Sequence, residues 1–178
     1  MSLKQNFQLM AEYNRWINER LYRAASQLDA TEIEQDRGAF FGSIIGTLNH
    51  ILVGDIFWLK RFADHPAKLD SLDYVRHMDK PVALDAILHR DLQALRKERV
   101  TMDDVVQGFV EQLDESLLTS SLTYQNTRGE SFSKTLAHLI QHFFNHQTHH
   151  RGQVTTLLSQ AGVDVGVTDL LVCIPNEL

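Results

Sequence analysis

The chain of 178 residues has a single cysteine, Cys173, and therefore cannot form an internal disulfide bond. A disulfide-stabilised secreted scaffold is thus excluded. Cys173 lies in the apolar run LLVCIP, which favours a packed thiol over a catalytic nucleophile. No apolar run approaches the ~20 residues that a membrane-spanning helix needs, and the N-terminus lacks the pattern of a secretory signal peptide. We therefore expect a cytoplasmic protein with no membrane partner.

Positive charge is also scarce, since 17 basic residues stand against 23 acidic ones and give a net charge of −6. A nucleic-acid-binding domain normally carries a basic patch or stripe, so we expect no nucleic-acid partner. One group of basic residues is interpreted as the solvated face of a helix: Arg90, Arg96, Lys97 and Arg99. The length is that of one domain, covering residues 1–178.

Only three prolines and nine glycines occur, and long stretches carry apolar residues at helical spacing. This pattern predicts an all-α fold, a four-helix bundle in which at least one connection is long. The predicted helices run from about Leu3 to Leu28, Phe40 to Ala63, Leu84 to Leu117 and Ser133 to Gly162. The pattern leaves open whether Thr101 interrupts the third helix.

The connections between these helices differ in character. Residues 65–81 begin and end near a proline and are expected to form a loop, whereas residues 122–133 predict a short β-hairpin or an irregular loop. Residues 163–178 form a tail with enough apolar side chains to dock on the bundle. The second predicted helix contains Gly42, Gly46 and Gly54, which either permit the close approach of a neighbouring helix or mark a kink.

The most informative stretch is HLIQHFFNHQTHH at residues 138–150, which holds five of the nine histidines. Positions four apart lie on one face of a helix, one turn above the other. This spacing joins His138, His142, His146 and His150, and His149 lies three residues after His146. Histidine is the commonest metal ligand among the side chains, so this face indicates a metal site.

A metal site on two helices usually takes a pair of ligands four residues apart from one helix and a third ligand from its neighbour. His146 and His150 offer the pair, with His142 and His149 as competitors. His50, the one histidine of the second predicted helix, is interpreted either as the third ligand or as a hydrogen-bonded core residue. Three histidine ligands leave one coordination position open for water or substrate.

The remaining candidates have simpler interpretations. His138 and His142 are compatible with packing or with supporting the ligands, and we expect His65, His77 and His89 on the surface. Arg151 either orients a substrate carboxylate or phosphate or forms a structural ion pair.

Two familiar metal motifs are excluded by the residues present. The zincin motif needs a glutamate directly after its first histidine as the general base, and that position holds Gln147. Carboxylate-bridged di-iron bundles need Glu-x-x-His on two helices, and the sequence has no such pattern. A mononuclear, nitrogen-rich site is left, and its donors suit zinc, nickel, copper or iron.

Four segments of the chain resemble the DinB-like (damage-inducible, YfiT-like) family of four-helix-bundle metalloproteins. They are YNRWINERL, FFGSIIGTLNHILVGDIFWLKRF, HFFNHQTHHRGQVTTLLSQAG and TDLLVCIP, in that order along the chain. The resemblance implies a divalent metal ion, zinc or nickel before iron or copper, bound by His50, His146 and His150. It also implies a homodimer.

The activity that the resemblance implies is the transfer of a low-molecular-weight thiol, such as bacillithiol or mycothiol, to a small electrophilic substrate. A metal ion deprotonates a thiol that binds to it, so this chemistry requires no protein cysteine. Two alternatives are metal-dependent hydrolysis and a non-catalytic stress protein that binds a metal or another ligand. No catalytic side chain is assigned.

Overall fold

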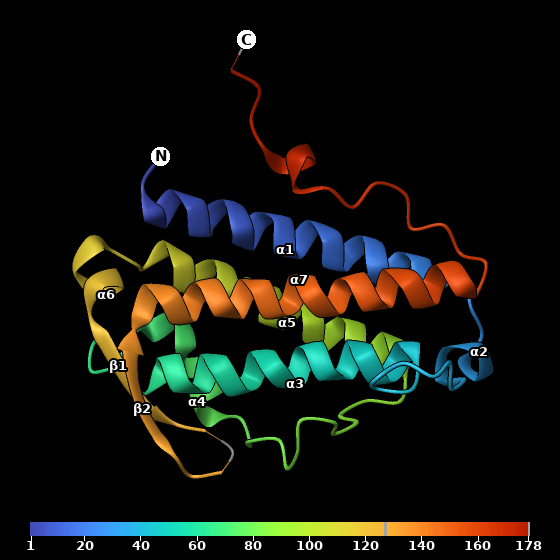
Figure 1. Ribbon diagram of the computed structural model, residues 1–178, viewed down its shortest axis with the longest axis horizontal. Helices are drawn as coiled ribbons and strands as arrows, with labels where there is room; N and C mark the ends of the chain where they lie inside the picture. The colour runs from blue at the N-terminus through green and yellow to red at the C-terminus, as the bar shows by residue number, and fades with distance from the viewer. Residues whose placement is uncertain (127, 178) are drawn as a thin grey trace.

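Four long helices lie side by side in the computed structural model, which describes residues 1–126 and 128–177 (Figure 1). These helices are α1 (Leu3–Ala25), α3 (Ile44–Ala63), α5 (Leu92–Glu111) and α7 (Leu136–Gln160). Helix α1 packs against α5 and α7, and α3 packs against the same two helices, so that the four close into a ring. The prediction of an all-α bundle is therefore confirmed. No helix in the described part of the chain is long and apolar enough to cross a membrane.

Short elements fill the connections between the long helices. They are α2 (Ala30–Glu34), the 3-10 helix η1 (Asp70–Leu72), α4 (Asp73–His77), α6 (Glu115–Thr119) and, in the tail, the 3-10 helix η2 (Leu170–Cys173). The predicted loop at residues 65–81 therefore contains two short helices, η1 and α4, with Leu72 and Val75 buried against the bundle.

The third predicted helix is shorter than expected at both ends. Helix α5 begins only after Asp91, whose side chain accepts a hydrogen bond from the backbone N–H of Ala94 (2.7 Å). It runs through Thr101 without interruption and ends at Glu111, after which α6 begins as a separate helix. The segment before Asp91 cannot be helical, because its backbone is bound elsewhere: the N–H groups of Leu88 and His89 donate to Oδ1 of Asn49 (2.8 and 3.0 Å).

The predicted β-hairpin before the last helix is confirmed. Strand β1 (Ser121–Gln125) pairs antiparallel with β2 (Ser131–Thr135), and β2 leads directly into α7. Leu122 is buried, and the ring of Tyr124 packs on Trp58 of α3 with 5.5 Å between centroids. The hairpin thus lies beside the C-terminal end of α3 (Figure 1). Residue 127, in the predicted hairpin turn, and residue 178, at the end of the predicted tail, lie outside the described residues.

Helix α7 ends as the sequence predicts, at a glycine with positive φ. Gly162 has φ +80°, its N–H bonds to the carbonyl of Ser159 (3.0 Å), and the N–H of Val163 bonds to that of Leu158 (2.9 Å). This pair of bonds is the Schellman motif, which satisfies the last carbonyl groups of the helix.

The tail docks on the bundle, more deeply in its first part than in η2, which also contacts α1. Val163 and Val165 are buried, and the hydroxyl of Tyr13 donates to the carbonyl of Thr168 (2.7 Å). Further on, Leu171 and Val172 are exposed. Cys173 is only partly buried, so it packs against the edge of the core and not within it.

A polar network is buried at the centre of the bundle and joins all four long helices. Its members are Asn14 and Asn18 of α1, Asp55 of α3, Arg99 and Asp103 of α5, and Gln147 and Arg151 of α7. Arg99 pairs with Asp55 and with Asp103 (3.1 Å for the latter), and its side chain is only 2% exposed. The interpretation of Arg99 as part of a solvated helix face is therefore wrong.

The network also contacts the helix that carries most of the histidines. Nε2 of Gln147 donates to Oδ1 of Asp55 (2.6 Å), and the guanidinium of Arg151 donates to Oδ1 of Asn14. Arg151 is buried, which argues against a role in orienting substrate, and it forms no ion pair with any residue that the structure describes, so the predicted ion pair is not found there. Because Gln147 and Arg151 directly follow His146 and His150, the network fixes the rotation of α7 about its axis.

Candidate metal centre

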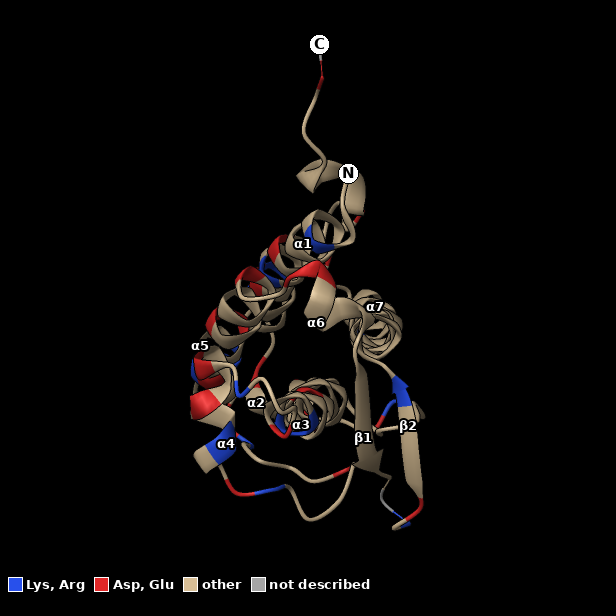
Figure 2. Cartoon of the chain, turned by 90° about the vertical axis from the view of Figure 1, so that its left-hand side faces the viewer, with Lys and Arg blue, Asp and Glu red and all other residues tan. Residues whose placement is uncertain are grey.

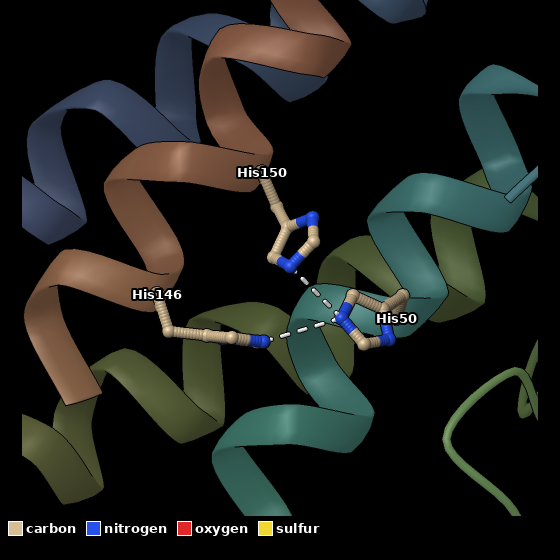
Figure 3. Close-up of side chains that lie close together, drawn as sticks. All are labelled: His50, His146 and His150. Atoms are coloured by element: carbon tan, nitrogen blue, oxygen red, sulfur yellow. Dashed lines mark hydrogen bonds between the residues drawn. The ribbon is translucent and has the colours of Figure 1, made fainter. Parts of the chain in front are cut away.

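Three imidazole rings converge between α3 and α7 (Figure 3). His50 comes from α3, and His146 and His150 come from successive turns of α7. Nε2 of His50 lies 3.2 Å from Nε2 of His146 and 3.1 Å from Nε2 of His150. The three nitrogen atoms all lie within 4.8 Å of one another. His50 is buried, and the other two are partly buried at the edge of the bundle.

The hydrogen bonds of the opposite ring nitrogens determine the tautomers. Nδ1 of His50 lies 2.8 Å from the carbonyl oxygen of Leu84, which can only accept, so this nitrogen carries the proton. Nδ1 of His150 lies 2.8 Å from Oε1 of Gln153 and carries its proton for the same reason. Nε2 of both rings then carries a bare lone pair, so both nitrogens are available as ligands to one cation.

The distances between the rings fit a metal ion. Tetrahedral coordination at about 2.0–2.1 Å from each nitrogen separates the ligand atoms by roughly 3.3 Å. The separations of 3.1 and 3.2 Å from His50 are close to that value. The three histidines therefore lie close enough together to hold one metal ion, with a fourth position left for another ligand.

Burial keeps the three imidazoles neutral, which is the form that binds metals. Burial, acting together with the nearby His150 and His50, lowers the pKa of His146 to about 3. Burial also lowers the pKa of His50 and of His150, although the hydrogen bonds to Leu84 and Gln153 act in the opposite direction.

Close packing holds the rings of His146 and His50 in place. A Cβ atom at Gly54 would lie 2.6 Å from Cε1 of His146, so only a glycine leaves room for that ring. The predicted close approach is thus confirmed for Gly54. The ring of Phe41 stacks on His50 with 3.7 Å between centroids and covers it from solvent.

The other histidines of α7 do not join the cluster. His138, His142 and His149 are exposed; the ring of His142 packs on Trp58, with 4.9 Å between centroids. His149 meets His150 edge-on at 4.8 Å.

His65, expected on the surface, is buried. Its Nδ1 accepts from the N–H of Ala67 (3.1 Å), and its Nε2 bonds to Oγ of Ser120 (2.9 Å). The prediction was wrong because His65 joins the segment after α3 to the end of α6, a contact between distant parts of the chain.

Several residues around the three histidines are not predicted from the sequence. Gln153, three residues after His150, had a detectable signal in its helical spacing. Leu84 and Asp85 had none, because their segment was assigned to a helix. Asp85 is an exposed acid whose charge acts to raise the pKa of His50, against the larger lowering by burial.

Comparison with known proteins gives two matches. The model of the DinB family matches residues 1–176. Protein DinB of Bacillus subtilis (strain 168) is 28% identical over 159 residues, which cover 89% of this chain and 87% of that protein. No solved structure matches the chain.

Proposed function

The chain belongs to the DinB family, and on that premise we propose that it binds one divalent metal ion through Nε2 of His50, His146 and His150. The observation that carries the proposal is the convergence of these three nitrogens, two of them with unprotonated lone pairs facing each other at 3.1 Å. Three imidazoles suit zinc or nickel, and also iron or copper.

We further propose that the protein is an enzyme that transfers a low-molecular-weight thiol to a small electrophile. A bound divalent ion lowers the pKa of a thiol that binds to it and so supplies a thiolate near neutral pH. The hydrogen-bond partners of His50 and His150 outside the cluster are a backbone carbonyl and an amide, not carboxylates. Thiol transfer needs no carboxylate base, so these surroundings are compatible with it.

The side chains around the cluster have a positioning role in this proposal. The carbonyl of Leu84 and the amide of Gln153 hold the rings of His50 and His150 so that Nε2 faces inward. Phe41 covers one face of His50 and keeps water from it. Gly54 leaves the space that the ring of His146 occupies.

An activity screen of the metal-loaded protein tests the proposal. With glutathione, bacillithiol and mycothiol offered against a panel of electrophiles, we expect consumption of at least one thiol. We expect this activity to disappear in His150→Ala and to persist in His77→Ala, a matched change at an exposed histidine. If no thiol is consumed with any electrophile, thiol transfer is refuted.

Asp85→Asn separates thiol transfer from hydrolysis. An essential general base contributes about 10²–10⁴-fold to a rate. If the reaction is thiol transfer, Asp85→Asn should keep its rate within about an order of magnitude, since no carboxylate base is required. Ester or amide cleavage without any thiol, reduced about 100-fold or more by Asp85→Asn, would instead establish a hydrolase.

A further inference from the structure

A second concave site lies at the other end of α3. It is a pocket of about 580 Å³ between α3, strand β1 and the segment after α4. Figure 2, which looks at the hairpin end of the molecule, shows α3 lying between α4 and β1. Four basic side chains line the pocket, namely Lys60, Arg61, Arg76 and Lys80. Asp64 is the acidic residue among the lining residues. We call this site the basic pocket.

Two of the four cations already have partners. Nζ of Lys60 donates to the carbonyl oxygens of Val75 (2.7 Å) and Met78 (2.5 Å), and it thereby closes the end of α4. Arg76 forms an ion pair with Asp73. These residues build the wall of the basic pocket.

Arg61 and Lys80 have no carboxylate partner among the described residues. The guanidinium of Arg61 lies 4.6 Å from the ring of Trp58 and 5.0 Å from that of Tyr124. Nζ of Lys80 lies 5.3 Å from the ring of Phe57. Aromatic faces hold both cations in place but satisfy none of their N–H donors, which are left for an anion.

A row of aromatic rings connects the basic pocket to the histidine cluster, and it consists of Tyr124, Trp58 and His142. His142 lies between them, with its ring 6.2 Å from that of His146 and 4.9 Å from that of Trp58. His50 and Arg61 are eleven residues apart on α3 and so about 16 Å apart along its axis. On one side of α3, His146 borders the histidine cluster and Tyr124 borders the basic pocket. On the other side, the segment after α4 borders the cluster through Leu84 and the basic pocket through Lys80.

We propose that the basic pocket binds the carboxylate or phosphate group of an elongated small molecule whose other end reaches the histidine cluster. Arg61 and Lys80 bind the anion, and the row of aromatic rings contacts the chain between the two ends. The connection to the cluster rests on the proposed metal site, whereas the anion site stands on the pocket itself.

The first experiment tests anion binding alone. Inorganic phosphate and glutarate are titrated into the full-length protein as purified, and binding is followed by ¹⁵N NMR at the amides of Thr123 to Gln125. We expect saturable shifts there, with affinity reduced about tenfold or more in Arg61→Gln and in Lys80→Gln, the loss of one charge-assisted hydrogen bond. Lys97→Gln, the matched change at an exposed lysine of α5, should bind as the wild type does. Equal affinity in all variants, or no shifts, would overturn the anion site.

The second experiment tests whether one molecule spans both sites. Zinc-loaded protein is titrated calorimetrically with ω-mercaptocarboxylates of increasing length and with ω-mercaptoalcohols of the same lengths. Above a threshold length we expect the acid to bind about tenfold more tightly than the alcohol, and Arg61→Gln to abolish this preference. Equal affinity of acid and alcohol at every length would refute the span. If zinc itself does not bind, the proposed metal function fails, and the NMR titration alone decides the anion site.

Discussion

His146→Ala is expected to weaken metal binding by about 100–1000-fold. Structural zinc sites with four protein ligands bind with about 10–16 kcal/mol, which corresponds to roughly 2.5–4 kcal/mol for each ligand. His146 supplies one of only three imidazoles in the cluster, and its pKa of about 3 leaves it unprotonated and ready to bind at neutral pH. Competition against a chromogenic chelator measures the affinity.

His142→Ala is the matched control, because His142 lies one turn before His146 on α7 but outside the cluster. It should retain wild-type affinity. Gly54→Ala should weaken binding while keeping all three histidines, since the new Cβ would meet Cε1 of His146 at 2.6 Å and push the ring away. Equal loss in His142→Ala, or full affinity in His146→Ala, would contradict the assignment of the ligands.

Arg99→Met is expected to lower the free energy of unfolding by about 3–5 kcal/mol, the cost of removing one partner from a buried ion pair. Arg99 is 2% exposed, and Asp55 and Asp103, which it joins, are almost fully buried. Burial acts to lower the pKa of Arg99, but the charges of Asp103 and Asp55 raise it above its usual value, so the guanidinium is charged. Without it, two buried carboxylates lose their main counter-charge. Urea unfolding at pH 7 measures the change.

Arg96→Met provides the control for this experiment, three residues earlier on the same helix. Arg96 is only partly buried and forms no ion pair among the described residues, so the same substitution should change stability by less than about 0.5 kcal/mol. Arg99→Met with Asp55→Asn and Asp103→Asn should recover part of the loss, because no unpaired charge is then left. A loss below about 1 kcal/mol in Arg99→Met would show that the network contributes little to the fold.

The histidine cluster could be predicted because its main signal is local. A spacing of four residues places His146 and His150 on one face of α7 whatever the rest of the chain does. His50 was identifiable because it was the one histidine in a long apolar segment. The glycines of that segment had two interpretations, and only the packing of α3 against α7 shows that Gly54 faces the ring of His146.

The residues that the sequence did not reveal depend on contacts between distant segments. Arg99 lies beside exposed basic residues along the chain, and only its pairing with Asp55, 44 positions away, explains its burial. The segment before Asp91 has apolar residues at helical spacing, but Asn49 binds its backbone and excludes a helix there. Arg61 and Lys80 likewise become one site only because α3 and the segment after α4 lie side by side.

X-ray absorption spectroscopy of the zinc-loaded protein tests the three-histidine centre most directly. We expect one zinc ion per chain with three imidazole nitrogens at about 2.0–2.1 Å and one exchangeable light-atom ligand. Addition of a low-molecular-weight thiol should replace that ligand with one sulfur at about 2.3 Å. A protein that retains no zinc, or a spectrum with fewer than three imidazoles and no change on addition of thiol, would contradict the proposed centre.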